Sequence, residues 1–277
     1  MLNYQVLPHS QSKEWIMLLH GLGGSSNIWY KQIEELNSKY NLLLPDFYGH
    51  GRTRQVLPEY TFPELAEGVV GVLDELQLKK VHVMGVSLGC IVACTLALHH
   101  GHRLKSMILV GAIQNMNLQT RTLLYTAKYL KHFVPYMWLY KFFAWIIMPG
   151  PAQKKSRSVF VREARQLGAT EFKKWHSLLL EFPRFCRKFL DPDIYSVPKL
   201  FISGSQDYLF LRHVREHVAQ DPNSALHVIP RCGHICNIQA AEEFNKTVLQ
   251  YLDHASTSEY AGQIEDLPEW NGERSAA

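Results

Sequence analysis

Short apolar runs alternate with helix-compatible segments through the first third of the chain, and this alternation constrains its fold most strongly. The apolar runs cover residues 15–19, 41–44, 81–84 and 108–110. Continuous runs of this kind are typical of strands that are buried on both faces. The segments between them, residues 29–36, 62–76 and 88–99, have helical character. Strands that alternate with helices predict a mostly parallel sheet flanked by helices on both faces.

The alternation is interrupted in the middle of the chain. Strand signals stop near Ala112 and resume near Tyr195, with further strands expected at 199–203 and 225–229 and helices at 211–219 and 240–252. The interruption contains four expected helices, at residues 123–133, 136–147, 156–167 and 171–182. Gly168 is expected to end the third helix, and Pro183 to end or kink the fourth. We therefore predict an α/β core of residues 1–111 and 196–253, an all-helical cap of residues 112–195, and an acidic tail of residues 254–277.

The bulk composition favours an ordinary globular protein. The chain has 277 residues, of which 47% are hydrophobic, and this is enough to build a substantial core. The five cysteines are odd in number and include no C-x-x-C pair, so a disulfide framework is not expected. The N-terminal residues carry no secretory signal pattern, and we expect a cytoplasmic protein with no nucleic-acid partner. The apolar stretch 133–148 is sixteen residues long and contains Lys141, so we interpret it as a buried or pocket-lining helix rather than a membrane span.

Charge is distributed unevenly along the chain. The formal net charge is only +4, but the segment 121–188 holds fourteen Lys and Arg residues and three acids. Two interpretations stay open for this basic cap: a solvated surface, or attraction to an anionic substrate or a negatively charged membrane surface. The tail is acidic and is expected to be loosely attached, unless Leu267 and Trp270 anchor it to the body.

The motif Gly85-Val86-Ser87-Leu88-Gly89 joins an expected strand directly to an expected helix. A tight strand-to-helix turn of this kind holds a serine in a strained conformation with its hydroxyl accessible, and the glycines allow the backbones to approach closely. The backbone N–H of Leu88, at the start of the helix, is placed to stabilise an oxyanion near Ser87. Ser87 is therefore the candidate nucleophile.

A serine hydroxyl needs a base, and the base needs a carboxylate that orients it. Asp207 follows the expected strand 199–203, and His234 follows the expected strand 225–229. Because the carboxyl ends of parallel strands share one edge, both side chains can converge on Ser87. We predict a Ser87–Asp207–His234 catalytic triad, in which Asp207 is the least secure member because Asp191 and Asp193 are alternative acids.

Four motifs together resemble the α/β-hydrolase superfamily, over nearly all of residues 1–253. They are the serine turn, the Gly233-His234 turn, the loop Leu19-His20-Gly21-Leu22-Gly23-Gly24, and the turn Asp46-Phe47-Tyr48-Gly49-His50-Gly51-Arg52-Thr53. The resemblance implies that the backbone N–H of Leu22 is the second oxyanion donor, beside that of Leu88. The N-terminal strands expected for the family are shortened here to about residues 3–7.

The type of nucleophile narrows the chemistry. Relatives that use Asp at this turn, such as haloalkane dehalogenases and epoxide hydrolases, are excluded because the residue here is Ser87. We expect a serine hydrolase that cleaves a carboxylic ester or related acyl bond through an acyl-enzyme, without a cofactor or a metal. The many aromatic residues of the cap indicate a small-molecule substrate with an apolar acyl or aromatic group, and the basic cap leaves weak contact with a membrane surface open.

Two other functions remain as alternatives. One is a hydrolase or lyase of an anionic carbonyl compound, resembling C–C-bond hydrolases or lactonases, with Arg121, Arg162 or Arg184 binding the carboxylate. The other, more remote, is a non-catalytic ligand receptor on the same scaffold. His20 and His50 are interpreted as structural residues, and Cys90 and Cys94 as core residues. The sequence Cys232-Gly233-His234-Ile235-Cys236 superficially resembles a zinc site but has no second ligand pair.

Overall fold

A computed structural model describes residues 1–190 and 196–255 of the chain. Its centre is a seven-stranded sheet with the strand order β1-β3-β2-β4-β5-β6-β7. Only β1 runs antiparallel to its neighbour, β3, and the other neighbouring strands are parallel. The strands are β1 Tyr4–Leu7, β2 Trp15–Leu19, β3 Asn41–Pro45, β4 Val81–Val86, β5 Leu104–Val110, β6 Lys199–Gly204 and β7 Ser224–Ile229. The predicted fold class is confirmed.

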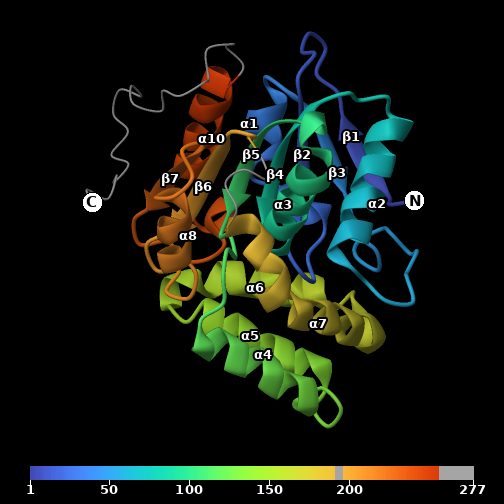
Figure 1. Ribbon diagram of the computed structural model, residues 1–277, viewed down its shortest axis with the longest axis vertical. Helices are drawn as coiled ribbons and strands as arrows, with labels where there is room; N and C mark the ends of the chain where they lie inside the picture. The colour runs from blue at the N-terminus through green and yellow to red at the C-terminus, as the bar shows by residue number, and fades with distance from the viewer. Residues whose placement is uncertain (191–195, 256–277) are drawn as a thin grey trace.

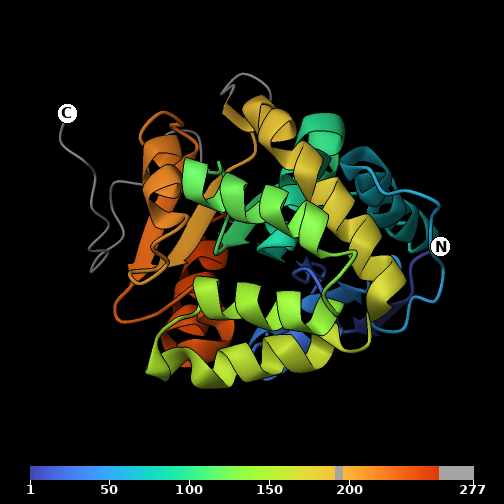
Figure 2. The same ribbon diagram turned by 90° about the horizontal axis from the view of Figure 1, so that it is seen from below.

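Helices cover both faces of the sheet, as Figures 1 and 2 show. One face carries α2, α3 and α8, and the other carries α1 and α10. The helices of this core are α1 Ile33–Asn37, α2 Phe62–Glu75, α3 Leu88–His100, α8 Leu211–Val218, α9 Cys236–Gln239 and α10 Ala241–Ala255. Helix α3 is buried almost all round from Leu88 to Ala97 because it packs on β4 and β5 and also against α2. This burial holds the start of α3 rigidly beside the end of β4.

The cap insertion lies beyond one end of the sheet, at the bottom of Figure 1. It consists of the four helices α4 to α7, with 3-10 turns at Pro151–Gln153 and Cys186–Leu190. The helices are α4 Leu118–Leu130, α5 Tyr136–Ile147, α6 Lys154–Ala164 and α7 Gly168–Phe185. Helix α4 packs against α7, and α5 packs against α6. The cap is connected to the core between β5 and β6, so it covers the edge at which the parallel strands end.

Three local predictions differ from the structure. The helix expected at residues 29–36 is replaced by a 3-10 turn at Ser26–Trp29 and the short helix α1, because Gln32 between them is buried and donates to Asn237 and Asn245. Gly168 has the left-handed φ of +79° expected after a helix end, but it is the first residue of α7. Pro183 was expected to end or kink the fourth helix. Because α7 continues past it to Phe185, the expected helix end at this position is wrong, and a kink stays a prediction.

None of the helices in the described part of the chain is both long and apolar enough to cross a membrane. The apolar stretch 133–148 forms α5, whose inner face is buried through Leu139, Tyr140, Ala144 and Ile147. The sequence predicted a buried or pocket-lining helix, but only one face of α5 is buried, and Trp138, Phe142 and Trp145 on its other face are exposed. The tail predicted at residues 254–277 lies outside the described residues beyond Ala255.

Candidate active site

Ser87 occupies a strained turn between β4 and α3. Its backbone has φ 52° and ψ −108°, a conformation that L-residues rarely adopt. The flanking glycines allow the close approach that the turn requires. A Cβ atom on Gly85 would lie 2.4 Å from the carbonyl carbon of Gly89, and one on Gly89 would lie 2.2 Å from the carbonyl oxygen of Leu19. The turn presents Ser87 half-buried, in front of the N-terminus of a helix.

Asp207 and His234 form a hydrogen-bonded pair at the same end of the sheet. The distance from His234 Nδ1 to Asp207 Oδ2 is 2.8 Å, and the two side chains are only 1% and 2% exposed. Asp207 follows β6, and its backbone N–H donates to the carbonyl of Gly204. The ring of Phe210 lies 5.3 Å from the imidazole, centroid to centroid. Because water is excluded from both side chains, this hydrogen bond holds the imidazole in one orientation.

The end of β5 connects Ser87 to this pair. The backbone N–H of Ser87 donates to the carbonyl of Val110 over 3.0 Å. The next residue, Gly111, has φ +53°, and a Cβ atom there would lie 3.1 Å from both Cε1 and Nδ1 of His234. Any larger residue at position 111 would therefore displace the imidazole. The structure brings the regions of Ser87, Asp207 and His234 together at the carboxyl edge of the sheet.

The loop that contains Leu22 lies against the serine turn. A Cβ atom on Gly21 would lie 3.6 Å from Cβ of Ser87 and 3.4 Å from the carbonyl oxygen of Val86. The phenol of Tyr140, in the cap, donates to the carbonyl of Leu22 over 2.6 Å. This hydrogen bond fixes the peptide plane that follows Leu22. Leu88 is the first residue of α3 and directly follows Ser87, so both predicted N–H donors lie in segments that border Ser87.

His20 and His50 hold the loops behind the serine turn. The backbone N–H of Phe47 donates to Nε2 of His20 over 3.0 Å, and that of Gly23 donates to Nε2 of His50 over 2.9 Å. Burial lowers the pKa of His20 to about 4. Burial, followed by the neighbouring His20, lowers the pKa of His50 to about 3. Both imidazoles are neutral near pH 7 and accept hydrogen bonds from backbone groups.

The turn at residues 46–53 is held by its own carboxylate. Oδ1 of Asp46 accepts from the N–H of Ser26 over 2.7 Å, and Oδ2 accepts from that of Arg52 over 2.8 Å. A Cβ atom on Gly51 would lie 2.2 Å from Oδ2 of Asp46, so only glycine fits there. The hydroxyl of Thr53 donates to the carbonyl of Asp46. The turn is therefore joined through Asp46 to Ser26, at the start of the 3-10 turn that follows the Leu22 loop.

Gln153 was missed by the sequence analysis, although it lies between the loops that carry Asp207 and His234. Its side chain is buried, and Nε2 donates to Oε1 of Gln206 over 3.3 Å. A Cβ atom on Gly233 would lie 2.5 Å from Nε2 of Gln153. Gln153 belongs to the cap, in a stretch without a motif, so no signal in the sequence marked it.

Glu163 is a second cap residue that the sequence did not mark. Its side chain is 5% exposed, and Oε2 accepts from the hydroxyl of Ser25 over 2.8 Å. Together with Tyr140 and Gln153, it ties the cap to the loops of the core. The alternative acids Asp191 and Asp193 lie outside the described residues.

The arginines considered for an anionic substrate lie on the surface. Arg121 and Arg184 are exposed, and Arg162 is 66% exposed and paired with Glu163 over 3.3 Å. Cys90 and Cys94 are buried in α3. Among residues 1–190 and 196–255, no group of three or more His, Cys, Asp or Glu side chains could hold a metal ion.

Comparison with known proteins places this geometry in a family. The family model described as the alpha/beta hydrolase fold matches residues 14–241, which is most of the chain. The chain belongs to the α/β-hydrolase fold family. It is an enzyme of that family, a hydrolase, and the resemblance noted from the four motifs is confirmed.

Individual relatives are distant in sequence. The chain is 25% identical over 254 residues to a protein of a Caulobacter species, provisionally named carbamate hydrolase RutD, covering 88% of this chain and 92% of that one. An esterase from Exiguobacterium antarcticum superposes with a TM-score of 0.79 and 18% identity, covering 91% and 95%. An enol-lactonase from Burkholderia xenovorans superposes with a TM-score of 0.74 and 21% identity, covering 91% and 96%. At these identities the structural likeness shows the fold alone.

Proposed function

We propose that this α/β-hydrolase is a serine hydrolase that cleaves a carboxylic ester, or a related acyl bond, through an acyl-enzyme on Ser87. The observation that carries the proposal is the buried 2.8 Å hydrogen bond between His234 and Asp207, at the sheet edge that also holds the strained Ser87 turn. An oriented imidazole beside an accessible serine is the arrangement that nucleophilic acyl transfer requires.

The proposed mechanism uses this chain's own groups throughout. Oγ of Ser87 attacks the carbonyl carbon while Nε2 of His234 takes the hydroxyl proton. Asp207 accepts a hydrogen bond from Nδ1–H of His234 and stabilises the imidazolium that forms. The backbone N–H groups of Leu22 and Leu88 bind the oxyanion, and the loss of one such donor typically costs about 3 kcal/mol in the barrier.

The acyl-enzyme then forms and is hydrolysed. His234 gives its proton to the leaving alcohol as the tetrahedral intermediate collapses, which leaves the acyl group on Ser87. A water molecule attacks this ester while His234 takes a proton from the water. His234 then returns the proton to Oγ of Ser87 as the acyl–oxygen bond breaks, which frees Ser87 and releases the carboxylic acid as product. The same steps cleave a lactone, which is a cyclic ester, or a carbamate, so relatives named lactonase and carbamate hydrolase are compatible with the proposal.

The alternative is a hydrolase of an anionic carbonyl compound. It would need a cation that faces the reacting group, but Arg121, Arg162 and Arg184 are exposed, and Arg162 pairs with Glu163. Half-buried apolar side chains are common on the cap helices, for example Leu124 on α4, Phe143 on α5 and Leu179 on α7. This distribution favours an uncharged acyl or aromatic substrate.

A substrate panel tests the proposal. Nitrophenyl esters of increasing chain length, lactones and carbamates would be assayed with the wild type and with Ser87→Ala, and we expect turnover of at least one ester class by the wild type only. A fluorophosphonate probe should label the wild type and leave Ser87→Ala unlabelled. If folded wild-type protein neither reacts with the probe nor hydrolyses any member of the panel, the proposed function is wrong.

A further inference from the structure

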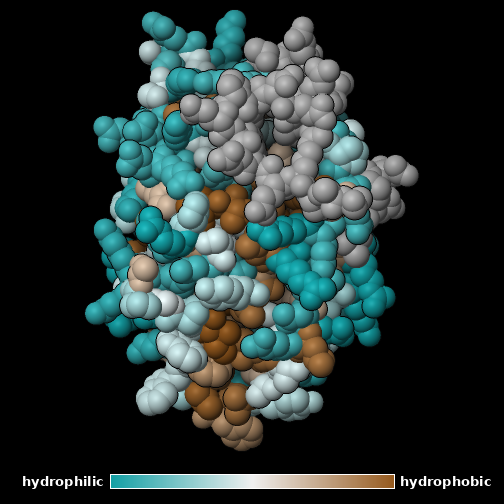
Figure 3. Space-filling model, turned by 90° about the vertical axis from the view of Figure 1, so that its left-hand side faces the viewer, coloured by the Kyte–Doolittle hydropathy of each residue, from teal (hydrophilic) through white to brown (hydrophobic). Residues whose placement is uncertain are grey.

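The outward faces of α4 and α5 expose large aromatic side chains. On α5, Trp138, Phe142 and Trp145 are 71%, 54% and 56% exposed at helical spacing. Tyr129, on α4, and Phe133, in the turn that follows α4, are 69% and 87% exposed. We call these five residues the aromatic face of the cap. Figure 3 shows hydrophobic side chains gathered at the lower end of the molecule, which is the cap end in Figure 1.

Helix α5 therefore has two apolar faces, of which only one is needed for folding. Its inner face packs into the protein through Tyr140, Ala144 and Ile147, which are 1%, 0% and 4% exposed. A helix on the surface of a globular protein normally presents charged and polar side chains to the solvent. Here the outer face combines Trp138, Phe142 and Trp145 with a single cation, Lys141. Folding of the cap does not explain this composition.

The surroundings of the aromatic face are strongly basic. Two of the three acids of the segment 121–188 are occupied in internal contacts: Glu163 with Ser25, and Glu171 with Lys174 over 2.9 Å. In the described part of the cap, Glu181 is the acid that remains exposed. Exposed basic side chains lie on the same two helices, at Arg121, Lys128 and Lys141. Others lie on or next to the neighbouring cap helices α6 and α7, at Lys154, Lys155, Arg165 and Lys173.

We propose that the aromatic face of the cap binds the surface of an anionic lipid bilayer. Tryptophan and tyrosine favour the headgroup region, where the ring is partly apolar and its N–H or O–H stays hydrated. Lysine and arginine beside them are attracted by anionic headgroups, and their long stems let the charge remain in water. A helix with aromatic and basic side chains on one exposed face is typical of proteins that lie on a membrane without crossing it.

The charge of the cap makes a second copy of this chain an unfavourable partner for the aromatic face. If the aromatic faces of two copies packed against each other, Lys128 and Lys141 of both copies would lie close together and repel. Neither α4 nor α5 has an exposed acid that could pair with them. An anionic bilayer complements both properties of the surface. Since α4 and α5 lie at the end of the molecule where the parallel strands terminate, docking would turn the Ser87 end toward the lipid (Figure 1).

Flotation with vesicles tests the proposal on the full chain. Vesicles of phosphatidylcholine with about 30 mol% phosphatidylglycerol should bind the protein at least ~10-fold more strongly than pure phosphatidylcholine vesicles. Sodium chloride at about 0.5 M should reduce this difference, because it screens charges beyond a few ångströms. Binding that is absent, or equal on both kinds of vesicle, would overturn the proposal.

Matched variants separate this surface from the rest of the molecule. Trp138→Ser with Trp145→Ser should weaken binding to anionic vesicles by ~10-fold or more, since both lost side chains favour the bilayer interface. As a control, Tyr30→Ser removes an aromatic side chain that is 47% exposed but lies outside the cap, in the α/β core. This variant should bind vesicles as the wild type does. Circular dichroism checks that each variant is folded. If the cap variant floats as well as the wild type, or if it only abolishes a dimer seen by sedimentation in the absence of lipid, the assignment of this surface is wrong.

The inference goes beyond the proposed activity and does not depend on it. Ser87→Ala should bind vesicles as the wild type does, because the nucleophile lies under the cap and not on its outer face. Wild-type protein that floats with the vesicles but hydrolyses no member of the substrate panel would count against the proposed function alone. Wild-type protein that hydrolyses a substrate but does not float would count against the membrane surface alone.

Discussion

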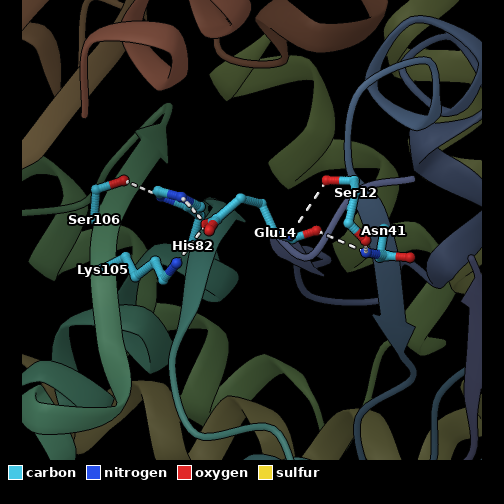
Figure 4. Close-up of polar contacts among 6 residues, drawn as sticks. All are labelled: Ser12, Glu14, Asn41, His82, Lys105 and Ser106. Carbon is cyan, nitrogen blue, oxygen red and sulfur yellow. Dashed lines mark hydrogen bonds and ion pairs between the residues drawn. The ribbon is translucent and has the colours of Figure 1, made fainter. Parts of the chain in front are cut away.

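A serine, a histidine and a carboxylate meet at each end of the parallel strands, and the two clusters differ in almost everything except residue type. At the carboxyl end, His234 binds Asp207 beside the Ser87 turn. At the amino end, shown in Figure 4, Nδ1 of His82 lies 2.7 Å from Oγ of Ser106, and its Nε2 lies 3.4 Å from Glu14. His82 Nε2 and the Glu14 carboxylate are therefore close enough for an ion pair, but they form no hydrogen bond.

The two serines differ in their backbone conformation and in their exposure. Ser106 lies within strand β5, directly opposite His82, next to a shift in the register of β4 and β5 between Val81 and His82. Both side chains are fully buried. Ser87 stands on a strained turn, half-buried, at the start of a helix. In the proposed mechanism, a substrate carbonyl approaches Ser87 and meets N–H donors there, whereas Ser106 is fully buried within a strand. On this proposal, access and backbone geometry, more than residue types, distinguish the two serines.

The two imidazoles, of His82 and His234, also differ in the charged groups around them. Burial lowers the pKa of His82 to about 4, against the opposing effect of Glu14, and Lys105 lowers it further. Lys105 also pairs with Glu14, as Figure 4 shows. In the amino-end cluster the carboxylate is therefore shared with a lysine. At the carboxyl end, the pair of His234 and Asp207 is 1% and 2% exposed and has no such cation in its hydrogen bond.

The largest expected difference between the clusters is in catalysis by the two serines. Ser87→Ala should lower kcat by about 10⁵-fold or more, because no other group can take over the nucleophilic attack. Ser106→Ala should leave kcat/KM within about 2-fold and reduce the free energy of unfolding by roughly 1–2 kcal/mol, since it removes a buried partner of His82. Steady-state assays on the best ester and urea unfolding would measure both. A folded Ser106→Ala variant with the activity of Ser87→Ala would break the comparison.

The two carboxylates should differ next. Asp207→Asn should lower kcat by about 10⁴-fold while substrate binding changes little, because the amide no longer holds the correct tautomer of His234. Glu14→Gln should leave activity unchanged and cost about 1 kcal/mol or less of stability, since its side chain is one-third exposed (33%) and its ion pair is partly screened. A comparable loss of kcat in both variants, with normal unfolding midpoints, would contradict this assignment.

Acid should destabilise the fold through the histidines that are held neutral. The pKa of His82 is lowered to about 4, so the unfolded chain binds more protons than the folded one between about pH 6.5 and pH 4. This contribution to stability is fully present above pH 6.5 and is lost as the pH falls toward 4. His20 and His50 act in the same direction, with pKa values lowered to about 4 and about 3.

Urea unfolding at several pH values measures this effect. We expect the free energy of unfolding to fall by roughly 1–3 kcal/mol for each such histidine over that range. His82→Gln should flatten the pH dependence by one histidine's share, and His99→Gln, a substitution on the exposed end of α3, serves as the control. An unchanged pH dependence in His82→Gln would show that a lowered pKa of His82 does not contribute to the acid destabilisation.

The smallest expected effect concerns the cap residue beside the carboxyl-end cluster. Gln153→Ala removes a side chain that contacts Gly233 and donates to Gln206, next to both His234 and Asp207. We expect a fall in kcat of about 3- to 10-fold with little change in KM, because a slight displacement of a catalytic group already costs rate. Gln153→Glu keeps the shape of the side chain and should lose less. A rise in KM of similar size would instead indicate that Gln153 contacts substrate.

Local sequence patterns predicted the elements of the sheet well. The run 81–84 became β4 Val81–Val86, and the run 199–203 became β6 Lys199–Gly204, because continuous apolar residues have few alternatives to a buried strand. Predictions failed where a distant residue decided the backbone. The helix expected at 29–36 is broken because Gln32 is held by Asn237, which is more than 200 residues away.

The candidate site divides in the same way. Ser87 is marked by its glycines, since a turn this tight excludes side chains at Gly85 and Gly89 whatever the rest of the molecule does. Asp207 and His234 were predicted from their positions after strands, but their hydrogen bond depends on how β6 and β7 lie side by side. Gln153 and Tyr140 reach the site across the cap, and no local pattern encodes such a contact.

The strand and helix alternation, the helical interruption and the strained serine turn can be predicted from the sequence alone, because they depend on backbone geometry within a few residues. Three properties are visible only in the folded chain: which of two Ser–His–carboxylate clusters is accessible, which cap residues reach the loops of the candidate site, and which aromatic side chains of the cap face outward. Those properties depend on burial, and burial is set by residues that meet only after the chain has folded.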